Sequence, residues 1–284
     1  MSTDSTLSTF VAIDGDNIAV QDWPLQAEQP LRAVVILIHG LGEHAGRYER
    51  LAGRLNDWGF AVRGYDQYGH GESGGRRGSL LTDTRLLDDL ADIVDSARAR
   101  MNPEIPLILL GHSLGGLVAA RFVALALRPV DALVLSSPAL ELGLNPAQKL
   151  LLAVLPKIAP NWCVGNGLDP ALISHDPAVV AAYRADKLVH DRISGRLARF
   201  MADAGPATLA LAATWQVPTL LLYAGADRLV NPAGSRAFAA AAPKQVVRAR
   251  SFESLYHEVF HESESEPVFT ELKQWLDAQF QVLA

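Results

Sequence analysis

The stretch that most constrains the fold of this chain is Gly-His-Ser-Leu-Gly at residues 111–115. An apolar run at residues 105–110 precedes it, and apolar residues at helical spacing follow it at once, which predicts a strand, a very tight turn and a helix. Glycine is needed at both ends of the motif because a Cβ there would clash where the strand packs against the helix. Ser113 then lies at the tip of the turn, in a strained backbone conformation, with its hydroxyl toward solvent or substrate. We therefore predict that Ser113 is a nucleophile.

Predicted strands and helices alternate along the chain from residue 33 onward. Residues 33–38 form a continuous β-branched and aliphatic run, which is typical of a strand buried on both faces. A hairpin over residues 10–21 comes before it, and the later strands are expected at residues 60–62, 105–110, 132–136, 217–223 and 246–250. Such alternation indicates parallel pairing through right-handed crossovers. The expected fold is therefore α/β, with a mostly parallel, doubly wound sheet.

The alternation is interrupted once, between residues 139 and 215. This stretch contains helical patterns and prolines and no convincing strand, so we interpret it as an inserted helical cap. The chain is thus expected to form a core from residues 1–138 and 216–284, with the cap formed by residues 139–215.

Composition excludes several classes of function. A formal net charge of −6 argues against a nucleic-acid partner, because such a partner selects a basic face. The single cysteine, Cys163, excludes an internal disulfide and a thiolate metal cluster. Residues 1–9 lack the basic and apolar regions of a signal peptide, and the longest apolar runs, about six residues, are too short to span a bilayer. We expect a soluble, cytoplasmic protein, and the sequence predicts no oligomeric state.

A nucleophilic serine needs a base, and the base needs a group that orients it, because a serine hydroxyl is a poor nucleophile at neutral pH. In a parallel sheet these groups come from loops at the carboxyl ends of strands, where the tight turn also lies. Asp227 and His257 each follow one of the last two predicted strands, so the chain order serine, aspartate, histidine matches a known order of catalytic triads. Two alternatives stay open: Asp227 only caps a turn, or His261 is the base in place of His257.

Backbone N–H groups near Ser113 are candidates for holding the negative charge that develops on a substrate oxygen. The N–H of Leu114 opens the predicted helix, and the N–H of Leu41 lies in a loop whose flanking glycines allow close approach. The histidines lie in glycine-rich loops, in the cap or near the C-terminus, and none shows metal-ligand spacing with a carboxylate or cysteine partner. No metal and no cofactor are expected.

Four segments together resemble the monoacylglycerol lipase / lysophospholipase family of α/β-hydrolases. They read HGLGEHAGRY, YDQYGHGES, GHSLGG and GADRLV, and they begin at residues 39, 65, 111 and 225. The resemblance runs from about residue 30 to the C-terminus and implies the α/β-hydrolase fold with an inserted cap or lid. It also implies a triad of Ser113, Asp227 and His257, because the base of the family follows a tyrosine, and an oxyanion hole formed by Leu41 and Leu114.

In the cap, Tyr183 resembles a tyrosine that reaches the glycerol head group of the family's substrates. The chain departs from the family pattern at Lys187, where a proline is common, and at Ser254, where a glycine often precedes the histidine. Both departures leave the three residues of the predicted triad in place.

The expected activity is that of a serine hydrolase that cleaves carboxylic esters of lipids, monoacylglycerols first, through an acyl-enzyme. The same triad also suits lysophospholipids, thioesters and small soluble esters, which stay open as alternatives. A binding protein that keeps the fold without turnover is disfavoured, because such proteins usually lose a member of the triad and here all three positions are filled.

One predicted cap helix has an unusual distribution of apolar residues. A polar start at residues 145–149 is followed by an unbroken apolar run at residues 150–155, and such a helix cannot hide every face against the sheet domain. A fully buried cap helix is one interpretation. The other is that one face, with Leu151 and Leu155, lines an acyl tunnel while another face contacts a membrane or micelle surface transiently.

Overall fold

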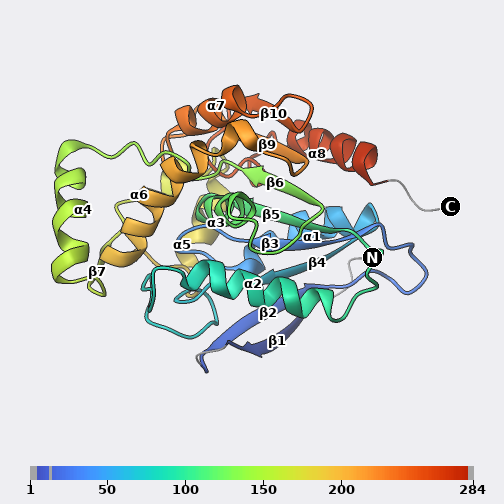
Figure 1. The fold of residues 1–284 in the computed structure, drawn as a ribbon, viewed down its shortest axis with the longest axis horizontal. Helices are drawn as coiled ribbons and strands as arrows, with labels where there is room; N and C mark the ends of the chain where they lie inside the picture. Colours follow the sequence, from blue (N-terminus) through green and yellow to red (C-terminus); the bar gives the residue numbers. More distant parts are fainter. Residues whose placement is uncertain (1–4, 13–14, 281–284) are drawn as a thin grey trace.

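The computed structural model describes residues 5–12 and 15–280, without the side chains of Ala147, Leu151 and Leu155. An eight-stranded sheet runs through the centre of the described molecule, in the order β1-β2-β4-β3-β5-β6-β9-β10 (Figure 1). Its strands are β1 (Thr6–Val11), β2 (Asn17–Trp23), β3 (Ala33–Ile38), β4 (Phe60–Tyr65), β5 (Leu107–His112), β6 (Ala132–Ser136), β9 (Thr219–Ala224) and β10 (Val247–Phe252).

Pairing is parallel from β4 across to β10 and antiparallel at the other edge, where β1 pairs with β2 and β2 with β4. This arrangement confirms the predicted α/β fold with a mostly parallel, doubly wound sheet, and it confirms the opening hairpin. Because the parallel strands share one direction, the loops after β3, β5, β9 and β10 meet at one edge of the sheet. That edge is where the candidate site residues of the core lie.

Helices cover both faces of the sheet, and two apolar clusters form the core between the layers. Alternate residues of β3 point to opposite faces: Ile36 and Ile38 join the cluster under α2, α3, α6 and α7, whereas Val35 and Leu37 join the cluster under α1 and α8. The core helices are α1 (Glu49–Asp57), α2 (Arg85–Arg98), α3 (Leu114–Ala124), α7 (Pro232–Ala241) and α8 (Glu266–Gln279).

Between β6 and β9 lies the segment that the sequence predicts as the cap. Its helices are α4 (Pro146–Ile158), α5 (Pro177–Ala185) and α6 (Gly195–Leu209), with short 3-10 turns at Pro170–Leu172 and Ala212–Thr214. The expectation of no strand here is wrong, because β7 (Cys163–Gly165) pairs antiparallel with β8 (Arg192–Ser194). A three-residue strand is too short to show the alternating pattern from which strands are predicted.

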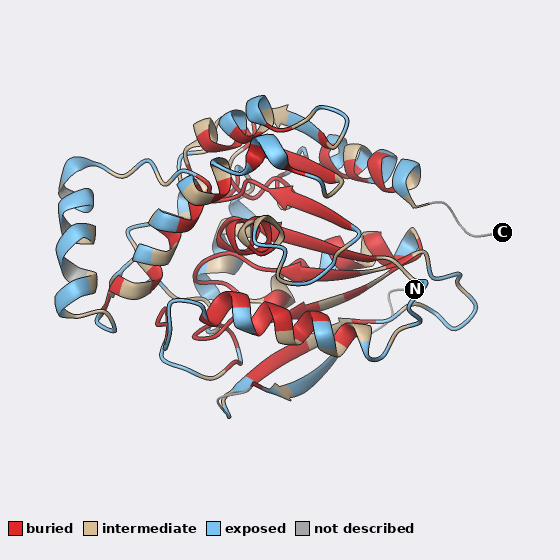
Figure 2. Ribbon diagram, in the orientation of Figure 1, coloured by how far each residue is buried: buried red, intermediate tan, exposed pale blue. Residues whose placement is uncertain are grey.

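Helix α4 stands away from the sheet, and most of its length is exposed (Figures 1 and 2). Leu150, Val154 and Ile158 repeat every four residues along one exposed side of it, with 69%, 47% and 75% of their surfaces accessible. Within the described part of the chain, no helix is both long and apolar enough to cross a membrane. Because these three apolar side chains of α4 are exposed, the interpretation of α4 as a fully buried cap helix is wrong.

Candidate active site

Ser113 lies in the turn between β5 and α3. Its φ of +52° and ψ of −116° are strained for a residue other than glycine, and the side chain is largely buried. A Cβ at Gly115 would lie 2.1 Å from the carbonyl oxygen of Ile38, so the helix can pack this closely on the strands only with glycine at that position. The strain and the close packing predicted from the motif are both confirmed.

Asp227 and His257 meet across the loops that follow β9 and β10. The Asp227 carboxylate accepts a hydrogen bond from His257 Nδ1 at 2.6 Å through Oδ2, and Oδ1 accepts from the backbone N–H groups of Leu229 and Val230 at 2.9 and 3.0 Å. Both side chains are almost fully buried. Donation from Nδ1 places the lone pair of the neutral His257 imidazole on Nε2, where it can accept a proton.

The Asp227–His257 contact shifts both pKa values. Burial disfavours the charged imidazole, but the Asp227 carboxylate outweighs burial and raises the pKa of His257 above its ordinary value. Burial likewise opposes ionisation of Asp227, yet His257 and the two backbone N–H groups lower the pKa of Asp227. His112, beside His257, has its pKa lowered to about 4 by burial and by His257, so it is neutral at pH 7.

His261, the rival base in the sequence, lies in a different network. Its Nδ1 is 3.0 Å from a carboxylate oxygen of Glu258, and its Nε2 is 3.0 Å from the backbone carbonyl of Arg47. The structure therefore brings His257, and not His261, against the Asp227 carboxylate.

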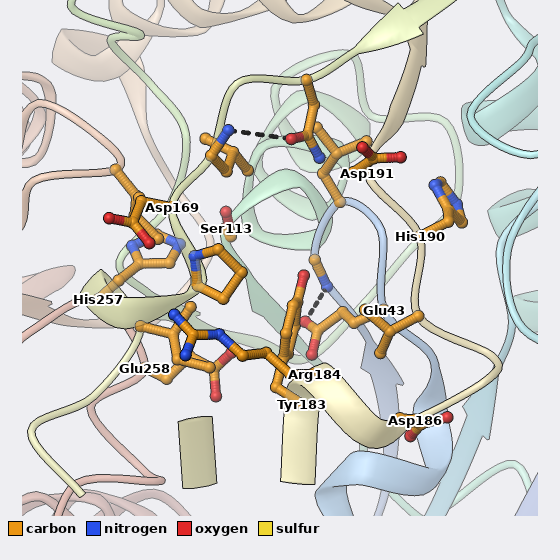
Figure 3. A pocket seen from close by; sticks show the side chains of 18 of the residues that line it. Glu43, Ser113, Asp169, Tyr183, Arg184, Asp186, His190, Asp191, His257 and Glu258 are labelled. Atoms are coloured by element: carbon orange, nitrogen blue, oxygen red, sulfur yellow. Dashed lines mark hydrogen bonds between the residues drawn. The ribbon is translucent and has the colours of Figure 1, made fainter. Parts of the chain in front are cut away.

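Two adjoining chambers share Leu41, Ser113 and His257 in their walls. One chamber, with a volume of about 310 Å³, is drawn in Figure 3, and we name it the polar chamber because most of the charged side chains of the site lie in its wall, beside apolar residues such as Ile173 and Val189. Its side chains include Glu43, Asp169, Tyr183, Arg184, Asp186, His190 and Asp191. The other chamber, of about 390 Å³, has a mainly apolar wall to which α4, α6 and neighbouring loops contribute Leu142, Leu144, Leu152, Leu172 and Met201. A substrate bound across Ser113 would thus meet most of the charged side chains on one side and a wall with few charges on the other.

The predicted oxyanion donors lie next to the serine. Leu114 is the first residue of α3, so its N–H belongs to the helix-start groups that have no partner inside the helix. Leu41 follows Gly40, where an added Cβ would lie 3.2 Å from Cβ of Ser113, so this loop passes directly beside the serine. The cap holds the same loop from the far side, because the N–H of His190 donates to the carbonyl of Gly42 at 2.8 Å.

A buried ion cluster that the sequence did not predict joins the loop after β3 to the loop after β10. The Arg47 guanidinium pairs with Glu43 and donates to both oxygens of Glu258 at 2.8 Å each. Glu43 also accepts from the N–H of Gly40 at 2.5 Å, a contact drawn in Figure 3, and from the hydroxyl of Tyr48 at 2.6 Å. Burial opposes ionisation, but Arg47 lowers the pKa of both carboxyls.

Sequence reasoning missed this cluster because Glu258 lies more than two hundred residues from Glu43 and Arg47 along the chain. The available signal was the presence of charged residues beside predicted buried strands and site residues. They are Glu43 and Arg47 in the segment at residues 39–48 and Glu258 directly after His257.

Tyr183, on α5, lines the polar chamber, and its ring lies over the Arg47 guanidinium with 4.6 Å between the guanidinium carbon and the ring centroid. Burial raises the pKa of its phenol, so the hydroxyl stays protonated and can donate a hydrogen bond.

The side chains of Leu151 and Leu155, predicted to line an acyl tunnel, lie outside the described residues. Among the described side chains of α4, those that line the apolar chamber are Gln148, Leu152 and Pro156. No group of three or more metal-ligating side chains occurs among the described residues.

This chain is similar to known proteins in both sequence and fold. The family described as "Serine aminopeptidase, S33" matches residues 29–264. The chain is 36% identical to the monoacylglycerol lipase of Mycolicibacterium smegmatis, with 94% of this chain and 95% of that protein covered, and 32% identical to phospholipase YtpA of Bacillus subtilis, with 90% and 98% covered. The crystal structure of Paleococcus ferrophilus monoacylglycerol lipase matches with a TM-score of 0.80 at 33% identity, covering 98% of this chain and all of that one. The chain therefore belongs to the monoacylglycerol lipase / lysophospholipase family of α/β-hydrolases.

Proposed function

We propose that this protein is a serine hydrolase whose preferred substrates are monoacylglycerols. Membership of the family already makes it a carboxylic ester hydrolase that acts on lipid or ester substrates. The observation that carries the proposal is that two chambers meet at Ser113, one with a mainly apolar wall and few charges and one whose wall holds most of the charged side chains. An acyl chain needs the first surface and a glycerol group needs the second.

In the first half of the reaction, Ser113 Oγ attacks the acyl carbon while His257 Nε2 takes its proton. The bond from Asp227 to His257 Nδ1 keeps the imidazole in the tautomer that can accept this proton and stabilises the imidazolium that forms. The N–H groups of Leu41 and Leu114 donate to the oxyanion of the tetrahedral intermediate. When the ester bond breaks, His257 returns the proton to the leaving alcohol oxygen, and the acyl group stays on Ser113.

In the second half, water replaces the alcohol. His257 takes a proton from the water as its oxygen attacks the acyl carbon, and the same two N–H groups hold the second oxyanion. Collapse of this intermediate breaks the bond to Ser113 Oγ, which regains the proton from His257, and the fatty acid leaves. All atoms and protons balance with water as the only co-reactant, so we propose no metal and no cofactor.

The charges of the polar chamber favour a neutral alcohol over a phosphate-bearing one. Its wall holds five carboxylates, those of Glu43, Asp169, Asp186, Asp191 and Glu258. Three guanidinium groups lie against them: Arg184 in the wall, Arg47 between Glu43 and Glu258, and Arg192 beside Asp191, and the ring of His44 contacts Asp186. An anionic phosphate would face net negative charge there, whereas the hydroxyls of glycerol can donate to carboxylates and accept from Tyr183. The second candidate is a lysophospholipase, which the likeness to the Bacillus phospholipase supports.

We further propose that α4 delivers the enzyme to lipid surfaces. Leu150, Val154 and Ile158 form one exposed apolar stripe, Trp162 lies just beyond the helix with 61% of its surface accessible, and Leu152 of the same helix lines the apolar chamber. Contact of the stripe with a membrane or micelle would place the chamber beside the substrate pool.

Turnover on a matched substrate panel tests the proposal. The panel holds one acyl chain constant on glycerol, on a lysophospholipid, on a thiol and on an aryl alcohol, and adds an aminoacyl arylamide because the family description names an aminopeptidase. We expect the highest kcat/KM on the monoacylglycerol and none on the arylamide. A higher kcat/KM on the lysophospholipid would move the assignment to the second candidate, and turnover of the arylamide alone would contradict the proposal.

A further inference from the structure

A buried carboxylate other than Asp227 lies at the end of the loop that carries His257. Glu262 has only 1% of its side chain accessible and comes five residues after His257 along the chain. We name residues 255–262 the histidine loop and residues 173–176, between the Pro170–Leu172 turn and α5, the cap segment. Four donors lie within hydrogen-bond distance of the Glu262 carboxylate: Tyr256 N at 2.6 Å, His175 Nδ1 at 2.8 Å, His175 N at 2.9 Å and Ser174 Oγ at 3.1 Å. The single hydroxyl proton of Ser174 is shared with the carbonyl of His261 at 3.0 Å.

Three of these donors belong to the cap segment, and the fourth is the backbone N–H of Tyr256, the residue directly before His257. On the other side of His257, the N–H of Glu258 donates to the carbonyl of Ile173 at 2.8 Å. The ring of His175 stacks on that of Tyr256 with 3.6 Å between the centroids. The cap segment and the histidine loop are thus joined immediately before and immediately after the imidazole.

Charge makes this junction rigid. A carboxylate has lone pairs for all four donors, and hydrogen bonds to an ionised acceptor are shorter and stronger than neutral ones. A glutamine of the same shape has one acceptor oxygen and brings an NH₂ group that would face donors. In one orientation of the amide this group would face the backbone N–H of Tyr256, and in the other that of His175, so the tie between the histidine loop and the cap segment is weakened at one end in either case. The imidazole of the residue after Tyr256 would then be held less firmly.

We propose that Glu262 is a positioning residue for ester hydrolysis, which holds His257 against Ser113 by tying the histidine loop to the cap segment. This role rests on the proposed function. It also couples the cap to the chemistry, because Ile173 lines the polar chamber while its carbonyl holds Glu258. A displacement of the cap segment would reach the imidazole through the backbone bond from Glu258 to Ile173 and through the Glu262 carboxylate.

Glu262→Gln tests the role, with Glu264→Gln as the control. Glu264 is an exposed carboxylate two residues after the histidine loop, so its replacement removes one negative charge without changing a residue of the junction. Hydrolysis of a soluble p-nitrophenyl butyrate is measured per serine titrated with a fluorophosphonate, which removes any effect of an unfolded fraction. We expect kcat of Glu262→Gln to fall about 10- to 100-fold with KM within about threefold, as for a misplaced catalytic group, and the control to match wild type.

A second readout reports the imidazole directly. The proton between His257 Nδ1 and Asp227 gives a low-field NMR resonance, which should shift or broaden in Glu262→Gln and stay unchanged in Glu264→Gln. Ser174→Ala breaks the junction from the cap side and leaves the carboxylate in place, so it should move kcat and the resonance in the same direction to a smaller degree. If Glu262→Gln does not fold, Ser174→Ala carries the test.

Three results would overturn the proposal. The first is a Glu262→Gln variant with the kcat of wild type per titrated serine and an unmoved resonance. The second is a loss of kcat in Glu264→Gln equal to that in Glu262→Gln. The third applies if Glu262→Gln is unfolded, and is a Ser174→Ala variant with the kcat and the resonance of wild type. If the wild-type protein hydrolysed no ester, the proposed function would fail. The resonance would then still decide whether Glu262 positions His257.

Discussion

At the scale of single residues, the structure concentrates strain and burial on the groups proposed to react. The positive φ of Ser113 costs a non-glycine residue about 1–3 kcal/mol, and the packing of α3 on β3 and β5 holds it there. The carboxylates of Asp227, Glu43 and Glu258 are buried together with the groups that donate to them. Buried ionised groups persist only with such partners, so these loops tolerate few alternative arrangements.

His257→Ala and His261→Ala distinguish the two candidate bases. We expect His257→Ala to lower kcat/KM by several orders of magnitude, because members of a triad act as one unit, and His261→Ala to stay within about tenfold of wild type. Ester turnover per folded protein, with circular dichroism as the folding control, is the measurement. The opposite ranking would transfer the role of base to His261.

The pH profile follows from the His257–Asp227 pair. Only neutral His257 can take the Ser113 proton, and its pKa is raised above the ordinary value of 6.5, so kcat/KM should rise with pH through an ionisation whose midpoint lies above 6.5. Asp227→Asn removes the carboxylate that raises this pKa, and should lower both the midpoint and, by several orders of magnitude, the rate. Rates on a neutral ester between about pH 5 and pH 9 give both values. A wild-type midpoint below 6.5 would be inconsistent with the pair.

What the sequence could predict at this scale depends on how local each signal is. Ser113 lies in a contiguous motif, and Asp227 and His257 could be chosen because each follows a strand that can itself be predicted. Arg47 with Glu258, and Ser174 with Glu262, are pairs formed only by tertiary packing between distant segments. No spacing rule along the chain connects them, so they could not be inferred without the fold.

At the scale of elements, the core was predictable and the cap only in outline. The core strands and helices have long, regular apolar patterns, and the predicted alternation matches β3 to β6 and β9 to β10. In the cap, β7 and β8 have three residues each, and the apolar residues of α4 are divided between a chamber and solvent. A helix with two apolar faces predicts burial and exposure equally well until the surrounding elements are placed.

Helix α6 offers a test of the acyl chamber. Ala198 lines the apolar chamber, so Ala198→Leu should fill part of it and shorten the preferred acyl chain, while short esters keep their kcat/KM within about twofold. Each methylene excluded from the chamber forfeits about 0.8 kcal/mol, or roughly fourfold in kcat/KM. The adjacent, exposed Arg199 provides the control Arg199→Leu. Esters of graded chain length give the profile, and an equal loss at every length in Ala198→Leu would exclude this chamber as the acyl site.

At the scale of the whole molecule, loops at one edge of the sheet carry Ser113, Asp227 and His257, and residues between β6 and β9 line the chambers beside Ser113 and His257. Helix α4 projects away from the sheet (Figure 1). This arrangement predicts that surface binding and catalysis can be separated by mutation. Leu150→Ser and Ile158→Ser should lower turnover of monoacylglycerol in vesicles severalfold, because each removes exposed apolar area, and should spare a soluble short ester.

Leu7→Ser is the matched control for the surface experiment, since Leu7 on β1 is as exposed as Leu150, at 69%. Vesicle sedimentation and turnover are measured on the same preparations. Equal losses for Leu7→Ser, or losses on the soluble ester, would remove α4 from the account of lipid binding.

The central claim, that Ser113 carries the acyl group during ester hydrolysis, is tested most directly by glycerol release from a monoacylglycerol by wild type and Ser113→Ala. Alanine keeps the Cβ and so preserves the packing of the turn, and the midpoint of thermal unfolding should stay close to that of wild type. We expect the rate of glycerol release to fall by several orders of magnitude, as when other triad serines are removed. Retention of more than about a tenth of the wild-type rate by a folded Ser113→Ala protein would contradict the account.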